Sequence, residues 1–502
     1  MKKRIKTLLT SLGITFGVLI VGLSVAYGVL GTPPDLAREV TVLEELLPEG
    51  AKSYVAFPDL DAAAKLYGRS RLKRLARKLG IEEDFENLEQ VRRLNERTNG
   101  RFWDIIGSRF ITASYTNNRK LVISQPRWKV KTLFRAVLER GRKGEYQGIA
   151  YSVFPDGSAV AFAGDYFWFA TSEKLLKTAL RIAASSSVTE EDAFPVRSEG
   201  YLIYGVSRKR GEHLAFDEFR YLVYTDEKGL AASLEVDRPS GVLGDFIRDL
   251  KPPSDYSRIP HDAYLFINLA GVNPDAAWEN ATKLAKRNKT ETSLAIVDME
   301  EPMATLAEDA EDEVLFCMQG WDVDLWYAPA LWTLSVKASS ASSYSAWEAL
   351  IPQVFGEGWE DVSSTHRNVS YNAVHSTDSL AEFPPLAYFM FDGALTISSD
   401  TNLVPWILDA NSAGNTMAAS TEFRSRCSAA GVPNPIFYLD WNPFKEELKD
   451  YLLYAADRIL GFTPSDVERK IFPLLDGLEI TAVLADVDKD GESLVFTIRG
   501  VK

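Results

Sequence analysis

The sequence predicts an α+β protein, with an N-terminal transmembrane helix followed by two tandem related domains, each an antiparallel sheet with helices packed on it. Three observations support this prediction: an uncharged apolar stretch near the N-terminus, short apolar runs joined by polar turns, and a strand–helix phrase that occurs twice. Strands outnumber helices and do not alternate regularly with them, which argues against a doubly wound parallel sheet.

The apolar stretch runs from Thr7 to Gly31 and contains no charged residue over 25 positions. A helix of about 20 apolar residues is long enough to span a bilayer. Because basic residues precede the stretch, the positive-inside rule places residues 1–6 in the cytoplasm and the chain beyond Gly31 outside it. This predicts a single-pass protein of the cytoplasmic (inner) membrane whose bulk is periplasmic or otherwise extracytoplasmic. A cleaved signal peptide, cut near Ser24–Ala26, is the alternative.

The repeated phrase consists of a strand, a polar helix start and a helix. It reads "GDYFWFATSEKLLKTALRI" in the first half of the chain and "DGALTISSDTNLVPWIL" in the second. An ungapped alignment of the two phrases, which are 227 residues apart, places Ser172 opposite Ser399 and Leu176 opposite Leu403. Similar strands and helices occur in the same order around both phrases, which predicts a tandem duplication.

The duplication sets the predicted domain boundaries. The sequence predicts a cytoplasmic tail at 1–6, a transmembrane anchor at 7–31, a linker at 32–40, a first α+β domain at 41–238, a second linker at 239–258 and a second α+β domain at 259–502. Pro- and Gly-containing stretches without clear periodicity separate these segments.

The charge is distributed unevenly along the chain, which has a formal net charge of −14. The first 250 residues hold 38 basic and 32 acidic side chains, a net charge of +6, whereas the remainder holds 18 and 38, a net charge of −20. An acidic chain lacks the basic footprint of general nucleic-acid binding, so no nucleic-acid partner is expected. The asymmetry suggests that the two halves face different surroundings.

Sequence motifs for catalysis are absent: the chain contains no GxSxG, P-loop or GxGxxG pattern. The segment "DVDKDGES" begins like a calcium loop, but Thr497 stands where an EF-hand has its glutamate, so a hairpin turn at Gly491 is expected. Cys317 and Cys427 are too few for a zinc site, and the sequence leaves open whether they pair. We therefore predict no catalytic, cofactor-binding or metal-binding residues, and no enzyme activity.

The segment "RSRLKRLARKLG" predicts an amphipathic helix with a basic face close to the anchor. Basic side chains in such a position can contact anionic headgroups. A solvated helix packed on the first domain is the alternative. The membrane-surface candidates are Arg69, Arg71, Lys73, Arg74, Arg77 and Lys78.

The segment "GWDVDLWYAPALW" concentrates large aromatic residues, which are enriched in protein interfaces. If the segment is an exposed loop, it is a docking site; if its tryptophans flank a buried turn at Pro329, it belongs to the core. The partner-docking candidates are Trp321, Trp326, Tyr327 and Trp332.

Two phrases, "LPEGAKSYVAFPDLDAA" after the apolar segment and the later "DYFWFATSEKL", resemble a bacterial family of uncharacterised single-pass envelope proteins with a large extracytoplasmic region. The resemblance covers most of the chain through loose patterns. It implies an envelope location and this architecture, and it carries over no catalytic residues.

These observations lead us to expect a membrane-anchored extracytoplasmic binding or scaffold protein, acting as an accessory subunit of an envelope complex. The expected partners are the membrane, through the N-terminal helix and anionic headgroups, and other envelope proteins. A receptor for a small or lipidic ligand held between the two domains is the first alternative, and a hydrolase is the second.

Overall fold

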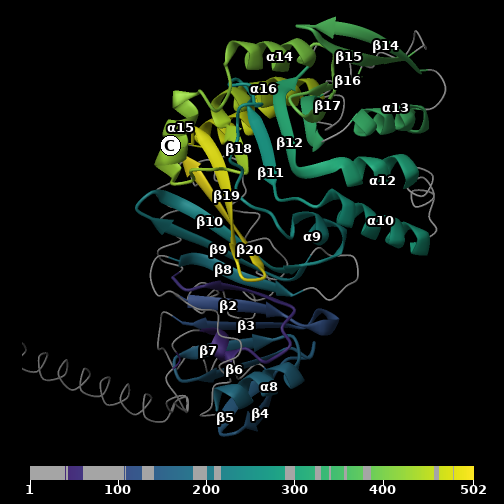
Figure 1. Cartoon of the computed structure of the whole chain (residues 1–502). Helices are drawn as coiled ribbons and strands as arrows, with labels where there is room; N and C mark the ends of the chain where they lie inside the picture. Colours follow the sequence, from purple (N-terminus) through teal and green to yellow (C-terminus); the bar gives the residue numbers. More distant parts are fainter. Residues whose placement is uncertain are drawn as a thin grey trace, which may run out of the picture. The chain divides into compact units, whose positions relative to one another are not determined.

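The computed structural model describes residues 40, 43–59, 107, 109–126, 141–184, 201–208, 216–288, 300–322, 330–338, 341–355, 359–376, 386–456, 463–478 and 480–501. These residues belong to two compact units. The first unit holds the described residues as far as Gly205, and the second holds those from Val206 onward. Figure 1 shows the strands and helices of both.

The first unit is built on an antiparallel sheet with the strand order β4-β5-β6-β7-β3-β2-β1. Its strands are β1 (Ser53–Phe57), β2 (Arg109–Ser114), β3 (Lys120–Gln125), β4 (Arg142–Tyr146), β5 (Ile149–Val153), β6 (Ala159–Ala163) and β7 (Tyr166–Ala170). Strand β8 (Tyr201–Arg208) begins in this unit and pairs with β1. Two 3₁₀ turns, η1 (Leu43–Leu46) and η2 (Thr116–Asn118), accompany the sheet.

Helix α8 (Glu173–Ala183) packs on β6 and β7 of the first unit. It begins at Ser172, whose hydroxyl accepts a hydrogen bond from the backbone N–H of Leu175. Such an N-cap satisfies one of the donors that the first helical turn leaves unpaired. Leu176 and Leu180 are fully buried on the inner face of the helix, so the sequence phrase that predicted a capped helix with a buried stripe describes this segment correctly.

The second unit has the strand order β9-β10-β20-β19-β18-β11-β12-β13-β17-β16-β15-β14, again antiparallel. Its strands are β9 (Phe216–Asp226), β10 (Gly229–Pro239), β11 (Leu265–Ala270), β12 (Ala310–Trp321), β13 (Ala330–Ala338), β14 (Trp359–His366), β15 (Val369–Ser376), β16 (Leu386–Phe391), β17 (Ala394–Ser398), β18 (Phe437–Asp440), β19 (Ala482–Asp490) and β20 (Ser493–Val501).

The helices of the second unit fall into two groups. Four of them, α9 (Gly241–Ile247), α10 (Pro274–Asn288), α12 (Glu300–Asp309) and α13 (Ala341–Phe355), pack successively against one another (Figure 1). The others are α14 (Leu403–Ala413), α15 (Thr421–Ala430), α16 (Trp441–Ala455), α17 (Pro464–Lys470) and α18 (Phe472–Gly477). Aromatic residues, including Phe266, Phe423 and Tyr438, form the centre of one core in this unit.

The strand order of the first half recurs in the second half. The series β4-β5-β6-β7-β3-β2-β1-β8 corresponds, strand by strand, to β14-β15-β16-β17-β13-β12-β11-β18. In each series the strand–helix phrase supplies the fourth strand and the helix that follows it. The phrase therefore has the same topological position both times.

The hydrogen bonds give the two phrases a register that differs by one residue from the ungapped sequence alignment. The backbone N–H of Lys120 donates to the Thr171 hydroxyl at 2.9 Å, and the backbone N–H of Trp332 donates to the Ser399 hydroxyl at 2.9 Å. In both cases, the hydroxyl of the first residue after the fourth strand accepts a hydrogen bond from the neighbouring strand segment. Ser399 corresponds to Thr171 and not, as the sequence predicted, to Ser172.

The predicted fold class is wrong. Antiparallel strands dominate the described structure, and helices α9, α10, α12 and α13 pack more extensively against one another than against the sheet. Periodicity identified strands and helices, but it does not determine which surface each helix covers.

The predicted location in the cytoplasmic membrane is contradicted as well. Among the described residues, no helix combines the length and the apolar character that crossing a membrane requires. The proposed anchor at 7–31 and the tail at 1–6 lie outside the described residues.

Candidate functional site

An apolar pocket in the second unit has one face of the β12–β13–β17 sheet as its floor. On β13, Leu334 and Val336 are two residues apart and therefore point to the same side. Ile397 lies opposite Leu334, and both Leu395 and Val314 lie opposite Val336, on the neighbouring strands. These five side chains form a continuous apolar surface.

The opposite face of the same strands carries hydroxyl groups. Thr333 and Ser335 alternate with the pocket residues of β13, and their partners on β17 are Ser398 and Thr396. All four side chains are buried, and the Ser335 and Thr396 hydroxyls are hydrogen bonded at 2.9 Å. The two-residue period of the strands thus separates an apolar floor from a polar, hydrogen-bonded underside.

The walls of the pocket are apolar stripes on four helices. Each stripe uses positions three or four residues apart, which lie on one side of an α-helix. The wall residues are Val242 and Phe246 of α9; Pro274, Ala277, Trp278 and Ala281 of α10; Met303, Leu306 and Ala307 of α12; and Ser343 and Trp347 of α13. Ala310 and Ala338, at the ends of β12 and β13, complete the lining.

Polar contacts outside the pocket hold these helices together in pairs. The carboxylate of Asp245 in α9 is bonded to Asn280 of α10 and to Arg248. The carboxylate of Asp309, at the end of α12, accepts hydrogen bonds from Ser342 and, at 3.2 Å, from Ser343 in the first turn of α13. A carboxylate near the first turn of a helix also interacts favourably with the helix dipole. The wall is therefore fixed by contacts that leave its inner face apolar.

The pocket has a volume of about 360 Å³. This lies within the range of about 300–1,000 Å³ that is usual for small-molecule sites. Ser343 is the only polar residue among the described residues that line it, and its hydroxyl is engaged by Asp309. The lining can therefore exclude water and bind hydrocarbon, but it offers no free group for acid–base or nucleophilic chemistry.

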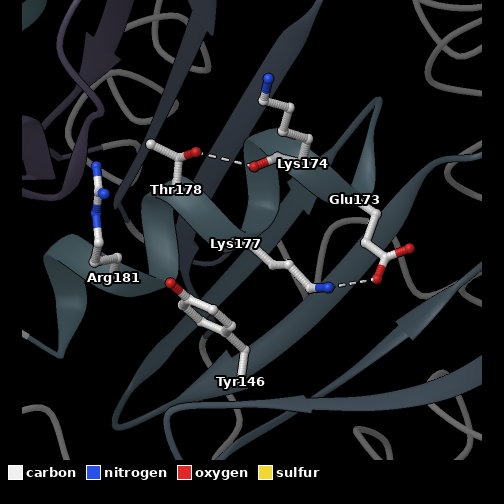
Figure 2. A pocket seen from close by; sticks show the side chains of 6 residues that line it. All are labelled: Tyr146, Glu173, Lys174, Lys177, Thr178 and Arg181. Carbon is white, nitrogen blue, oxygen red and sulfur yellow. Dashed lines mark hydrogen bonds and ion pairs between the residues drawn. The ribbon is translucent and has the colours of Figure 1, made fainter.

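A second depression, of about 460 Å³, lies on the outer face of α8 in the first unit and is polar. Its lining residues are Tyr146, Glu173, Lys174, Lys177, Thr178 and Arg181 (Figure 2). Glu173 forms ion pairs with Lys177 at 2.9 Å and Arg142 at 2.7 Å, and it accepts a hydrogen bond from the Tyr151 hydroxyl at 2.7 Å. The hydrogen bond from Lys177, followed by that from Tyr151, lowers the pKa of Glu173.

In Figure 2, Lys177 reaches toward Glu173, whereas Lys174 and Arg181 extend away from that pair. The basic side chains of this depression therefore do not converge on one point. Its central carboxylate is already surrounded by donors. The arrangement is that of a solvated ion-pair cluster on a helix surface, and we assign it no ligand.

Two of the aromatic docking candidates pack inside the second unit. The ring of Trp321 lies 5.5 Å from that of Phe444 and 5.2 Å from that of Tyr451, both in α16. Trp332 stacks on Phe316 with 6.1 Å between ring centroids. The remaining candidates lie outside the described residues: Trp326, Tyr327 and the basic-helix residues Arg69, Arg71, Lys73, Arg74, Arg77 and Lys78.

The structure gives a conformation to the calcium-like segment and to both cysteines. Gly491 has φ +62° in the turn between β19 and β20, as expected for a hairpin. No cluster of three or more potential metal ligands occurs among the described residues. Cys317 and Cys427 are free thiols buried in the same core, and burial raises their pKa values to about 12 and about 11.

The pocket was not predicted from the sequence. The stripes at Pro274–Ala281 and Met303–Ala310 were visible as apolar positions with helical spacing. Such stripes usually mark a core face, so the spacing alone does not distinguish a filled core from an open pocket. The signal that could have raised the question is the low number of large side chains, since alanine fills many of these positions.

Comparisons with known proteins give limited information. No family model matches the chain, and no curated protein matches it. Solved structures of TP0453 are similar to part of it: crystal form I has a TM-score of 0.27 at 10% identity, covering 43% of this chain and 90% of that chain. Crystal form III gives 0.26 at 11% identity, covering 43% and 90%, and crystal form IV gives 0.26 at 10%, covering 39% and 79%. This weak, partial similarity establishes no specific function.

Proposed function

We propose that the protein binds a small apolar ligand in the pocket formed by α9, α10, α12 and α13 over the β12–β13–β17 sheet. The observation that carries the proposal is the apolar composition of the lining. Its one polar side chain, Ser343, donates its hydroxyl hydrogen bond to Asp309. Every lining residue belongs to the second unit, whereas the sequence analysis placed such a ligand between two domains.

The driving force for binding is removal of apolar surface from water. Leu334, Val336 and Trp347 are half-buried because they face the pocket. Each square ångström of apolar surface that a ligand covers contributes about 25 cal/mol. An apolar ligand covers surface on both partners at once, whereas a polar ligand loses hydration without gaining hydrogen bonds here.

A scaffold role, as an accessory subunit that contacts other proteins, is the second candidate. Leu243 of α9 supports this role, because its side chain is 56% exposed and is not among the residues that line the pocket. Large apolar side chains that are exposed singly are common on protein surfaces. Ligand binding is therefore the better supported function.

The proposal is tested by titrating the full chain with a solvatochromic naphthalene-type dye, whose emission increases in an apolar site. We expect saturable binding by the parent. Ala281→Phe places a ring inside the pocket and should weaken binding at least tenfold. Lys283→Phe, on the exposed side of the same helix, is the matched control and should leave the affinity unchanged.

Denaturant unfolding of both variants separates a blocked pocket from a damaged fold. If the parent does not bind the dye, or if both variants bind as well as the parent does, the pocket is not a ligand site.

A further inference from the structure

The pocket presents carbon almost everywhere on its inner surface. Trp278 and Trp347 are the lining residues with N–H donors, yet both indole nitrogens are buried away from solvent and have no hydrogen-bond partner among the described residues. These two rings therefore face the pocket with ring carbon atoms and not with their N–H groups. Ser343 is 1% exposed and donates to Asp309. Nothing in the lining selects for a polar group.

Electrostatics also argues against a charged group inside the pocket. No lysine, arginine or histidine occurs among the described lining residues. At the α12–α13 end, the carboxylate of Asp309 accepts a hydrogen bond from the lining residue Ser343 at 3.2 Å, and this negative charge would repel an anion. A ligand with an ionised end must keep that end outside.

The volume limits how much hydrocarbon the pocket can hold. A methylene group takes up about as much space as a water molecule in the liquid, about 30 Å³, so 360 Å³ corresponds to roughly 12 carbons. The space is bounded by four helices and contains the flexible side chain of Met303. A flexible chain can follow such an irregular space, whereas a rigid ring system has to match its shape.

We infer that the pocket takes one unbranched hydrocarbon chain of about twelve carbons, with the polar end of the ligand outside. This inference rests on the proposed function and specifies its ligand. Both a free single-chain amphiphile and an acyl chain of a membrane lipid present this chemistry.

The test is a homologous series of n-alkanols from six to fourteen carbons, measured by displacement of the naphthalene dye from the full chain. Because each buried methylene contributes about 0.8 kcal/mol, affinity should rise about fourfold per carbon. The rise should stop near twelve carbons, when the pocket is full. The dodecanoate anion should bind within about threefold of dodecanol, because its carboxylate stays in water.

Two variants sharpen this test. Ala281→Leu adds three carbons to the pocket lining, so the chain length at which affinity stops rising should fall by about three. Lys283→Leu, on the exposed side of α10, should leave that length unchanged. A second arm adds phosphatidylcholine vesicles: dye displacement by vesicles identifies a membrane acyl chain as the source, and displacement by monomers alone identifies a free amphiphile.

The outcomes distinguish this inference from the proposed function. Dye binding without any dependence on alkanol length, or tighter binding of a rigid polycycle than of dodecanol, overturns the chain inference and leaves an apolar ligand site. Failure of every apolar probe to bind overturns both.

Discussion

The depression on α8 and the pocket of the second unit are similar in size, at about 460 and 360 Å³, but their lining groups are satisfied in different ways. On α8 the charged groups contact one another: Glu173 is contacted by Lys177, Arg142 and Tyr151, and the side chains of Lys174 and Arg181 are exposed. In the pocket, Leu334 and its neighbours on the sheet form an apolar surface that faces the open space of the pocket.

This difference shows why size alone does not indicate a binding site. Exposed ion pairs gain little from further partners, because water already solvates them and the pair itself contributes about 0–1 kcal/mol. Apolar surface has no such compensation and is stabilised only by being covered. The apolar pocket is therefore the region from which a ligand gains most.

The largest effect should come from the buried side of α8, just beneath the polar depression. Leu176 is fully buried, and Leu176→Ala should lower the free energy of unfolding by about 3–5 kcal/mol, since it leaves a cavity. Lys174→Ala, on the outer face, should change it by no more than about 0.5 kcal/mol. Urea denaturation measures both. Equal losses would show that the outer face is structural as well.

A buried carboxylate near α8 should give a pH dependence that Glu173 does not. Both oxygens of Glu44 are buried and accept no hydrogen bond from another described residue. Burial raises the pKa of Glu44 to about 7, against smaller opposing effects of its own backbone N–H and of Arg109. Stability from this group is complete below its unfolded pKa near 4.5 and is lost as pH rises through 7.

Glu44→Gln should therefore flatten stability between pH 5 and 8 and raise it at pH 8 by about 3 kcal/mol, from 1.36 kcal/mol per pKa unit. Glu173→Gln is the comparison. Because its partners lower the pKa of Glu173, this variant should keep the pH dependence of the parent between pH 5 and 8. Unfolding free energies at several pH values decide this. A Glu44→Gln profile parallel to that of the parent would mean that Glu44 is already ionised in the fold.

A ligand should stabilise the folded protein only when the pocket is open to it. With dodecanol at one hundred times its dissociation constant, the free energy of unfolding should rise by about 2.7 kcal/mol. Ala281→Phe should abolish this increase, whereas Glu173→Gln should retain it. Thermal unfolding with and without ligand provides the measurement, and an increase that survives Ala281→Phe would place the ligand elsewhere.

The smallest effect is expected for the ion pairs of the α8 depression. Glu173→Gln removes the acceptor shared by Lys177 and Arg142, and it should cost about 1 kcal/mol or less. Raising the salt concentration should reduce the cost further, because exposed charges are screened. A loss of several kcal/mol would show that this cluster holds the first unit together.

Local features of the fold could be predicted from the sequence. The helix start near Ser172 and the hairpin turn at Gly491 each depend on neighbouring residues, and each is found in the structure. The repeated phrase was also visible. Its register was not, because residue similarity favoured Ser172, whereas ladder hydrogen bonds make Thr171 the counterpart of Ser399.

The pocket depends on information that periodicity lacks. The stripe containing Ala277 and Ala281 predicts which side of α10 faces inward, but whether neighbouring helices close over small side chains depends on their packing distances. For the same reason, Trp321 and Trp332 could not be assigned to a surface or an interior before their partners Phe444 and Phe316 were placed beside them.

Contact between a hydrocarbon chain and the pocket tryptophans tests the central claim most directly. A bromine-labelled dodecyl chain should quench part of the fluorescence of the full chain, which has 11 tryptophans, because Trp278 and Trp347 line the pocket. We predict saturable quenching that is lost in the double variant Trp278→Phe, Trp347→Phe while its remaining fluorescence persists. Quenching of the same size in the double variant, or none in the parent, would contradict the account.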